Sequence, residues 1–227
     1  MKILAIETAT IAGSVAIIDD NAGLVGEIRV DVKVVHAERL MPSIEWLLKA
    51  SNFHISDFDA FAVSIGPGSF TGIRVSLAFC KGISSAANIP LIGVPTLDVL
   101  AQSLSHMNGH FLCPIIDAKK SEVFISLYHA SKGELKKLID DRAVKPGTVT
   151  DIIQKPCICF GTGIIACEPF MHGTEGIKIE KNAYKAVTAD ALIKTGIDTM
   201  KNSMKYNAKL IYGRKSEAEI KFNVTVD

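Results

Sequence analysis

Two carboxylates that each end a short apolar run are the first residues in this chain that could do chemistry. Glu7 closes the run "KILAIE" at residues 2–7, and Asp117 closes the run "FLCPIID" at residues 111–117. Carboxylates that face each other across a cleft can hold a metal-bound water. A carboxylate at the end of a strand is also an ordinary turn former, so a paired site and two separate turns are both open interpretations.

A glycine-rich run, "SIGPGSFTGIRVSLAFCKG", lies at residues 64–82. Glycines between a strand and a helix leave backbone N–H groups free beside the positive end of the helix dipole, which is an anion site in principle. The run has neither the Gly-Lys-Ser/Thr ending of a P-loop nor G-x-G-x-x-G spacing, so the nucleotide-loop readings fail. A tight turn before a helix capped by Ser69 or Thr71 remains, as does a surface that meets another protein. Three small residues near the helix start would suit the close approach of another helix: Gly72, Ser76 and Ala78.

Histidine and cysteine supply no recognisable metal motif. His36 begins a helical segment, but the residue four positions later is Leu40, so the paired histidines of a helical zinc site are missing. Cys157 and Cys159 are spaced C-x-C, and we expect them to be buried structural thiols on opposite faces of a strand.

Composition narrows the class of protein. The 227 residues include 25 Lys plus Arg against 24 Asp plus Glu, for a formal charge of +1, and this balance does not predict autonomous nucleic-acid binding. The five cysteines are scattered through apolar stretches, and the N-terminus lacks a secretory signal. With no apolar run near the ~18 residues of a membrane span, we expect a soluble, reduced, cytoplasmic protein that needs no membrane.

Hydrophobic periodicity predicts an α/β fold that positions these residues. The first half reads as a meander of three strands followed by alternating helices and strands. The predicted strands are residues 2–7, 13–19, 24–34, 59–65 and 91–94, and the predicted helices are residues 37–51, 70–87 and 97–105.

The pattern restarts after a polar segment at residues 105–110. Strand, acid, polar turn, strand and glycine turn recur in the same order, so duplication is one interpretation and coincidence the other. We therefore predict domains at residues 1–104 and 105–227. The predicted strands of the second are residues 111–117, 122–129, 157–160 and 220–226, with a helix from an N-cap at Thr188 to about Met200.

Five stretches of the sequence together resemble the TsaB (YeaZ) family, accessory subunits in making threonylcarbamoyladenosine on tRNA. They are "ILAIETAT" at residues 3–10, "HAERLMP" at 36–42, "VSIGPGSFTGIRVSLAFCKGI" at 63–83, "IPLIGVPTLDVLA" at 89–101 and "IIDAKKSEVF" at 115–124. The resemblance covers the N-terminal half closely and the C-terminal half thinly. It implies the actin-like, sugar-kinase and heat-shock ATPase fold (ribonuclease H-like), with two similar domains, mixed sheets and a degenerate second domain.

The resemblance also implies kinship with TsaD, a metal-dependent transferase whose helix carries two metal-binding histidines. This chain departs from that pattern at His36 and Leu40. The implied protein is a non-catalytic paralogue with no metal and no intrinsic cofactor. It would bind and activate TsaD as a heterodimer, with TsaE as a third subunit, ATP or ADP near the complex interface and tRNA bound only through the complex. Without a partner, the exposed apolar helices would favour self-association, and a homodimer and a monomer of the free chain both stay open.

The implied contact with TsaD uses the helices at residues 37–50 and 70–87. The candidate interface residues are His36, Glu38, Arg39, Leu40, Ile44, Leu47, Ser69, Phe70, Thr71, Gly72, Arg74, Val75 and Phe79. The sequence does not settle which of the apolar side chains face their own sheet.

Two other functions stay open at this stage. An ATP-binding small-molecule kinase or ATPase of the same fold would bind nucleotide near Glu7, Asp117, Gly161 and Gly163. The residues Ala-Lys-Lys-Ser that follow Asp117, in place of a glycine-rich phosphate loop, count against it. A metallopeptidase, a label that the wider family has carried, would require bound zinc.

Overall fold

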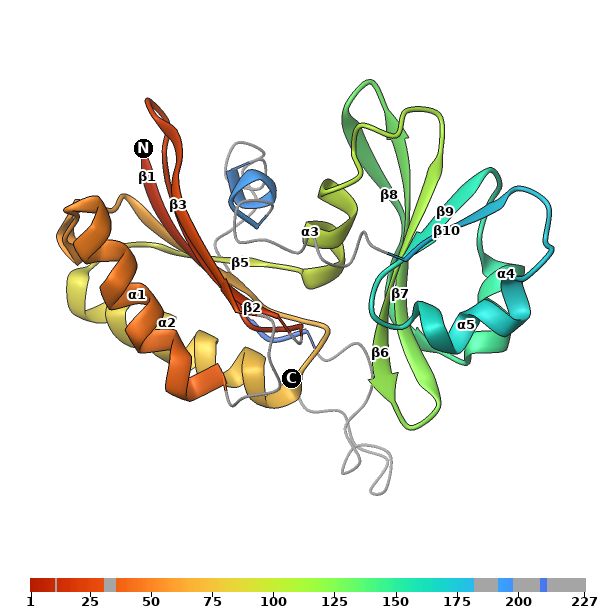
Figure 1. Cartoon of the computed structure of the whole chain (residues 1–227), viewed down its shortest axis with the longest axis horizontal. Helices are drawn as coiled ribbons and strands as arrows, with labels where there is room; N and C mark the ends of the chain where they lie inside the picture. The colour runs from red at the N-terminus through yellow and green to blue at the C-terminus, as the bar shows by residue number, and fades with distance from the viewer. Residues whose placement is uncertain (11, 31–35, 182–191, 198–208, 212–227) are drawn as a thin grey trace.

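The structure, a computed structural model, describes residues 1–10, 12–30, 36–181, 192–197 and 209–211. In this part of the chain two five-stranded sheets lie beside each other, each with helices on its outer face (Figure 1). Successive side chains of a strand point to opposite faces of its sheet, so the apolar runs of the sequence supply apolar side chains to both faces of each sheet.

The first sheet has the strand order β3-β2-β1-β4-β5. β1, β2 and β3 form the predicted antiparallel meander, and β4 and β5 join parallel to β1. The strands are β1 (Lys2–Glu7), β2 (Gly13–Asp19), β3 (Gly23–Val30), β4 (Ala60–Ser64) and β5 (Leu91–Val94). Parallel strands need crossover connections, and helices supply them here.

Two long helices cover the outer face of this sheet. α1 (His36–Ser51) and α2 (Phe70–Ala87) run side by side over that face, whereas the short helix α3 (Thr96–Gln102) lies between this sheet and the second one (Figure 1). Because side chains alternate along a strand, Leu4 and Ile6 pack towards α1 and α2 while Ile3 packs towards α3. A 3-10 turn, η1 (Ile55–Asp57), leads into β4.

The second sheet repeats the first. Read from its β8 edge, its order is β8-β7-β6-β9-β10, with the same sequence of antiparallel and parallel pairings. Its strands are β6 (Phe111–Lys119), β7 (Glu122–Ser131), β8 (Glu134–Val144), β9 (Cys157–Phe160) and β10 (Ile177–Glu180), and its outer face carries η2 (Pro146–Thr148), α4 (Val149–Ile152) and α5 (Ile164–Met171). The repeat predicted from the sequence pattern is confirmed at the level of topology.

The inner faces of the two sheets share one apolar core. Leu97 and Leu100 of α3 pack in a single cluster with Ile3 of the first sheet and with Leu112 and Phe160 of the second. The two halves are therefore joined by a continuous apolar contact as well as by the polypeptide chain. The domain division at residues 104 and 105 stays a prediction.

The strand pair Cys157 and Cys159 corrects one expectation. Both side chains are buried on the same face of β9, with their Sγ atoms 3.9 Å apart. Side chains two positions apart in a strand share a face, so the predicted opposite orientation was wrong. The prediction that these are buried thiols is confirmed, and all five cysteines are unpaired and buried.

The predicted elements mostly coincide with those of the structure, and most of the exceptions lie in the second half. The elements that were not predicted are η1, β8, η2, α4, α5 and β10. Residues 192–197 are helical, as expected, whereas Thr188 and the predicted strand at residues 220–226 lie outside the described residues. None of the helices in the described part of the chain has the length and apolar character needed to cross a membrane.

Candidate protein-interaction surface

Backbone atoms of the chain itself occupy the space beside the glycines of the run after β4. A Cβ atom on Gly68 would lie 2.3 Å from the carbonyl oxygen of Ala9, and one on Gly72 would lie 2.1 Å from that of Thr8. Ser69 is the N-cap of α2: its side chain accepts from the N–H of Gly72 at 3.3 Å, while its own N–H donates to Ala9 at 2.7 Å. The glycines thus allow α2 to begin directly against the turn that follows β1.

This packing corrects the expectation that small residues of α2 face another protein. Gly72 and Ser76 are buried on the inner side of the helix, and only Ala78 of the three is exposed. Gly72 is therefore no longer a candidate interface residue, because its small size allows the contact between α2 and the turn after β1.

The loop between β9 and α5 repeats the same contact. A Cβ atom on Gly161 would lie 2.3 Å from the carbonyl oxygen of Ile115, to which the N–H of Gly163 donates at 3.0 Å. Thr162 accepts from the N–H of Asp117 at 3.3 Å. The two glycines predicted for nucleotide binding are packed against the end of β6, as Gly68 and Gly72 are packed after β1.

Glu7 is enclosed by its own turn. Its side chain is fully buried, and one oxygen accepts from the N–H groups of Ala9 at 2.6 Å and Thr10 at 3.2 Å while the other accepts from the Thr10 hydroxyl at 3.0 Å. Burial raises the pKa of Glu7 to about 7, although these hydrogen bonds and the charge of Arg29 act in the opposite direction. The carboxylate holds the turn that supports the start of α2.

Asp117 lies in a different environment. Its side chain is 42% exposed and forms an ion pair with Lys119 at 2.6 Å. Partial burial raises the pKa of Asp117, but the hydrogen bonds and charge of Lys119 outweigh that effect and hold it below its ordinary value. Glu7 and Asp117 have no hydrogen-bond partner in common, and within the described ranges no three His, Cys, Asp or Glu side chains are grouped to hold a metal ion.

Three of the predicted interface residues face their own sheet. Leu40, Ile44 and Leu47 form the buried stripe of α1 and pack in one cluster with Ile6 and Val63. Their spacing of three and four residues places them on one side of the helix, and that side covers the sheet. They are core residues in this structure, so a contact surface on α1 must be built from its other side.

The other predicted residues whose side chains the structure describes reach the surface to different degrees. Phe70 is 56% exposed at the start of α2, and the guanidinium of Arg74 lies 3.9 Å from the centre of its ring. Glu38, Ser69, Thr71 and Arg74 are exposed, while Arg39, Val75 and Phe79 are partly buried. The side chain of His36 is not among those described.

Sequence reasoning missed the most exposed aromatic residue of α1. Trp46 is 62% exposed and Met41 is 42% exposed. Trp46 lies on one wall of an open groove between α1 and β3, lined by Ile28, Val30, Glu38, Arg39, Pro42, Ser43 and Trp46. A signal was available, because position 46 falls about 100° to 160° around a helix from Leu40, Ile44 and Leu47 and so outside the buried stripe. The only tryptophan of the chain is therefore presented to solvent.

Two mixed sheets of identical strand order, each with its helices outside and a shared core between them, define the class of actin-like, sugar-kinase and heat-shock ATPase folds. Within this class, residues 30–200 match the family model described as TsaD, tRNA N6-adenosine threonylcarbamoyltransferase. The chain belongs to this family.

Several relatives of the chain are named TsaB. The tRNA threonylcarbamoyladenosine biosynthesis protein TsaB of Escherichia coli is 33% identical over 160 residues, which are 69% of this chain and 63% of the relative. The TsaB of Bacillus subtilis is 31% identical over 144 residues, which are 63% of this chain and 62% of the relative. The chain thus matches somewhat less than two thirds of the length of these relatives.

A solved structure agrees over nearly the whole chain. A Pseudomonas aeruginosa protein described as similar to the peptidase YeaZ superimposes with a TM-score of 0.80 at 25% identity, covering 94% of this chain and 99% of that one. The expectation of a TsaB (YeaZ) relative with this fold is confirmed.

Proposed function

We propose that this chain is a non-catalytic subunit for the synthesis of threonylcarbamoyladenosine on tRNA, and that it binds and activates a TsaD partner through the outer faces of α1 and α2 and the edge of β3. The names of the Escherichia coli and Bacillus subtilis relatives support the pathway. The tRNA is bound through the complex.

The observation that carries this proposal is the exposed apolar surface of the N-terminal half. Trp46 and Phe70 are each more than half exposed on neighbouring helices, and Met41, five residues before Trp46 on α1, is exposed as well. Large aromatic side chains are enriched at the centre of protein interfaces, where they contribute more binding energy than other residues. Glu38 and Arg39 at the groove supply both signs of charge for its polar rim.

The interior of the candidate nucleotide site supports a non-catalytic role. The Glu7 carboxylate is saturated by its own turn, and backbone atoms occupy the space beside Gly161 and Gly163. Leu40, at the place where a second helical histidine would be needed, points into the core. These contacts favour a scaffold over the alternative of a small-molecule kinase or ATPase. TsaE as a third subunit, ATP or ADP at the complex interface, a homodimer of the free chain and a cytoplasmic location complete the proposal.

The proposal is tested by measuring binding of the TsaD protein of the same organism to the wild type and to Trp46→Glu. Truncating an interface tryptophan commonly costs about 2 kcal/mol or more, so we expect the dissociation constant to rise about 30-fold or more. Leu40→Asp is unsuitable, because a charge at this buried position would unfold the chain.

Ile165→Asp is the matched control. Ile165 is 79% exposed on α5, in the other half of the molecule, and the substitution likewise places a charge on an exposed apolar position. It should bind TsaD like the wild type. Undiminished binding by Trp46→Glu would refute the surface, and failure of the wild type to bind TsaD at all would refute the function.

A further inference from the structure

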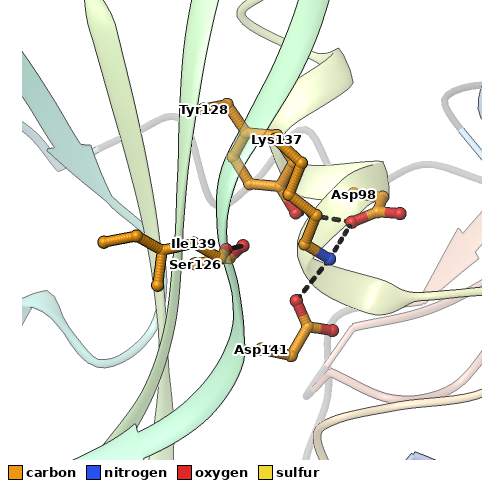
Figure 2. A network of polar contacts seen from close by, with 6 residues as sticks. All are labelled: Asp98, Ser126, Tyr128, Lys137, Ile139 and Asp141. Atoms are coloured by element: carbon orange, nitrogen blue, oxygen red, sulfur yellow. Dashed lines mark hydrogen bonds and ion pairs between the residues drawn. The ribbon is translucent and has the colours of Figure 1, made fainter.

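A network of four polar side chains, here called the seam network, joins the two halves at the edge of their shared core. It consists of Asp98 of α3 and of Tyr128, Lys137 and Asp141 on β7 and β8 (Figure 2). Asp98 Oδ1 accepts from the hydroxyl of Tyr128 at 2.5 Å and from the ammonium of Lys137 at 2.7 Å. Both bonds cross from the first half to the second.

Lys137 is held between two carboxylates. Its Nζ atom lies 2.7 Å from Asp98 and 2.6 Å from Asp141 on its own strand. Lys137 and Asp98 are about a quarter exposed, whereas the Asp141 side chain is only 6% exposed. Burial raises the pKa of Asp141 even though the charge and the hydrogen bond of Lys137 lower it.

Irregular pairing of β8 builds this arrangement. The register of β7 and β8 shifts twice, between Ile125 and Leu127 and again between Leu127 and Tyr128. Each extra residue in a strand exchanges the faces to which the following side chains point. Lys137 and Asp141 consequently face α3, while Ile139 between them points to the opposite side, into the outer core (Figure 2).

The seam network is polar and charged, whereas the rest of the contact between the two halves is largely apolar. Most of the contact between α3 and the second sheet is apolar, through residues such as Leu97, Leu100 and Leu112, and apolar contact has no preferred direction. Charge-assisted hydrogen bonds are short and directional. A buried ion pair adds little net stability, because desolvation offsets most of the attraction, and its best-attested use is to fix one arrangement among several.

We propose that Lys137, bonded to Asp98, is a latch that fixes the orientation of the two halves, and that breaking this bond lets the second sheet shift over α3. The apolar core keeps the halves together in either case. The latch acts on the relative position of the sheets and not on the outer faces of α1 and α2, so it is independent of the proposed binding surface.

The latch is tested by measuring the distance between the halves in Asp98→Ala. This substitution removes the two bonds that cross the seam and leaves the pair of Lys137 with Asp141 intact. Spin labels on cysteines introduced at Ser85, on α2, and Asp151, on α4, report the distance by pulsed electron resonance in the full chain. Both positions are exposed, and all five native cysteines are buried and so poorly labelled.

We expect one narrow distance distribution for the wild type and its loss, by broadening or displacement, in Asp98→Ala. Lys181→Met is the matched control: it breaks an ion pair of 2.6 Å with Glu168 that lies wholly within the second half, and it should keep the narrow distribution. If Asp98→Ala does not fold, Lys137→Met breaks the bond between Lys137 and Asp98 from the other side of the seam and carries the same expectation. A wild-type distribution in the folded variant, or an equal change in Lys181→Met, would overturn the proposal.

Discussion

Glu7 makes the stability of the fold depend on pH in a way that the structure lets us calculate. The carboxyl group is fully buried, and its pKa is about 7 in the folded chain against an ordinary value of 4.5. Between these two values the folded chain binds a proton at Glu7 that the unfolded chain has lost. The stability contributed by this group is therefore largest below pH 4.5 and is lost as the pH rises to 7.

The size of the effect follows from the same values. One pKa unit corresponds to about 1.36 kcal/mol, so the difference between about 7 and 4.5 is worth about 3 kcal/mol. Most of this, roughly 2.5 kcal/mol, should appear between pH 5 and pH 8.

Glu7→Gln is the perturbation that isolates the group. The amide oxygen can accept from the N–H groups of Ala9 and Thr10, and the amide NH₂ can donate to the Thr10 hydroxyl, which remains free to donate to the carbonyl of Ala12. The variant thus keeps the turn and removes the titration.

The assay is urea unfolding followed by far-ultraviolet circular dichroism, for both proteins at several pH values. The free energy of unfolding of the wild type, measured relative to Glu7→Gln, should fall by roughly 2.5 kcal/mol from pH 5 to pH 8. A difference that does not vary with pH in this range would show that Glu7 titrates normally and would refute the reasoning. A rise with pH would show that the hydrogen bonds of the turn outweigh burial.

Two further predictions concern the start of α2. Gly72→Ala places a Cβ atom 2.1 Å from a backbone oxygen and should lower the free energy of unfolding by about 1–3 kcal/mol. Gly82→Ala, on the same helix, meets nothing within 4 Å and should raise the free energy of unfolding by up to ~1 kcal/mol. Urea unfolding that gives the two variants the same stability would contradict this account. Ser69→Ala removes the N-cap and should cost about 1 kcal/mol in the same assay, while Thr71→Ala, the alternative cap in the sequence, should cost less than about 0.5 kcal/mol. Equal losses from both substitutions would argue against Ser69 as the cap.

The first sheet could be predicted from the sequence because local pattern and final structure agree there. β1, β2, α2 and β5 have the predicted bounds, since each is a regular run closed by turn residues. β8 could not be found in this way. Its two register shifts break the alternation on which strand prediction depends, so the run "ELKKLIDDRAV" carries no regular period.

The candidate surface shows a different limit. The sequence gives the apolar stripe of α1 but not what covers it, and Leu40, Ile44 and Leu47 were as good candidates for a partner contact as for the core. The same ambiguity applies to Gly72, whose small size fits both a partner helix and the neighbouring turn. Deciding between these uses requires the position of the sheet, which depends on pairing between distant segments.

The position of α3 has a consequence for how the chain is assembled during synthesis. When only the first 104 residues have left the ribosome, Leu97 and Leu100 lack the apolar neighbours that β6, β7 and β9 supply to their cluster. The nascent N-terminal half thus exposes an apolar inner surface until the later strands are synthesised, and we expect a chaperone to bind that surface.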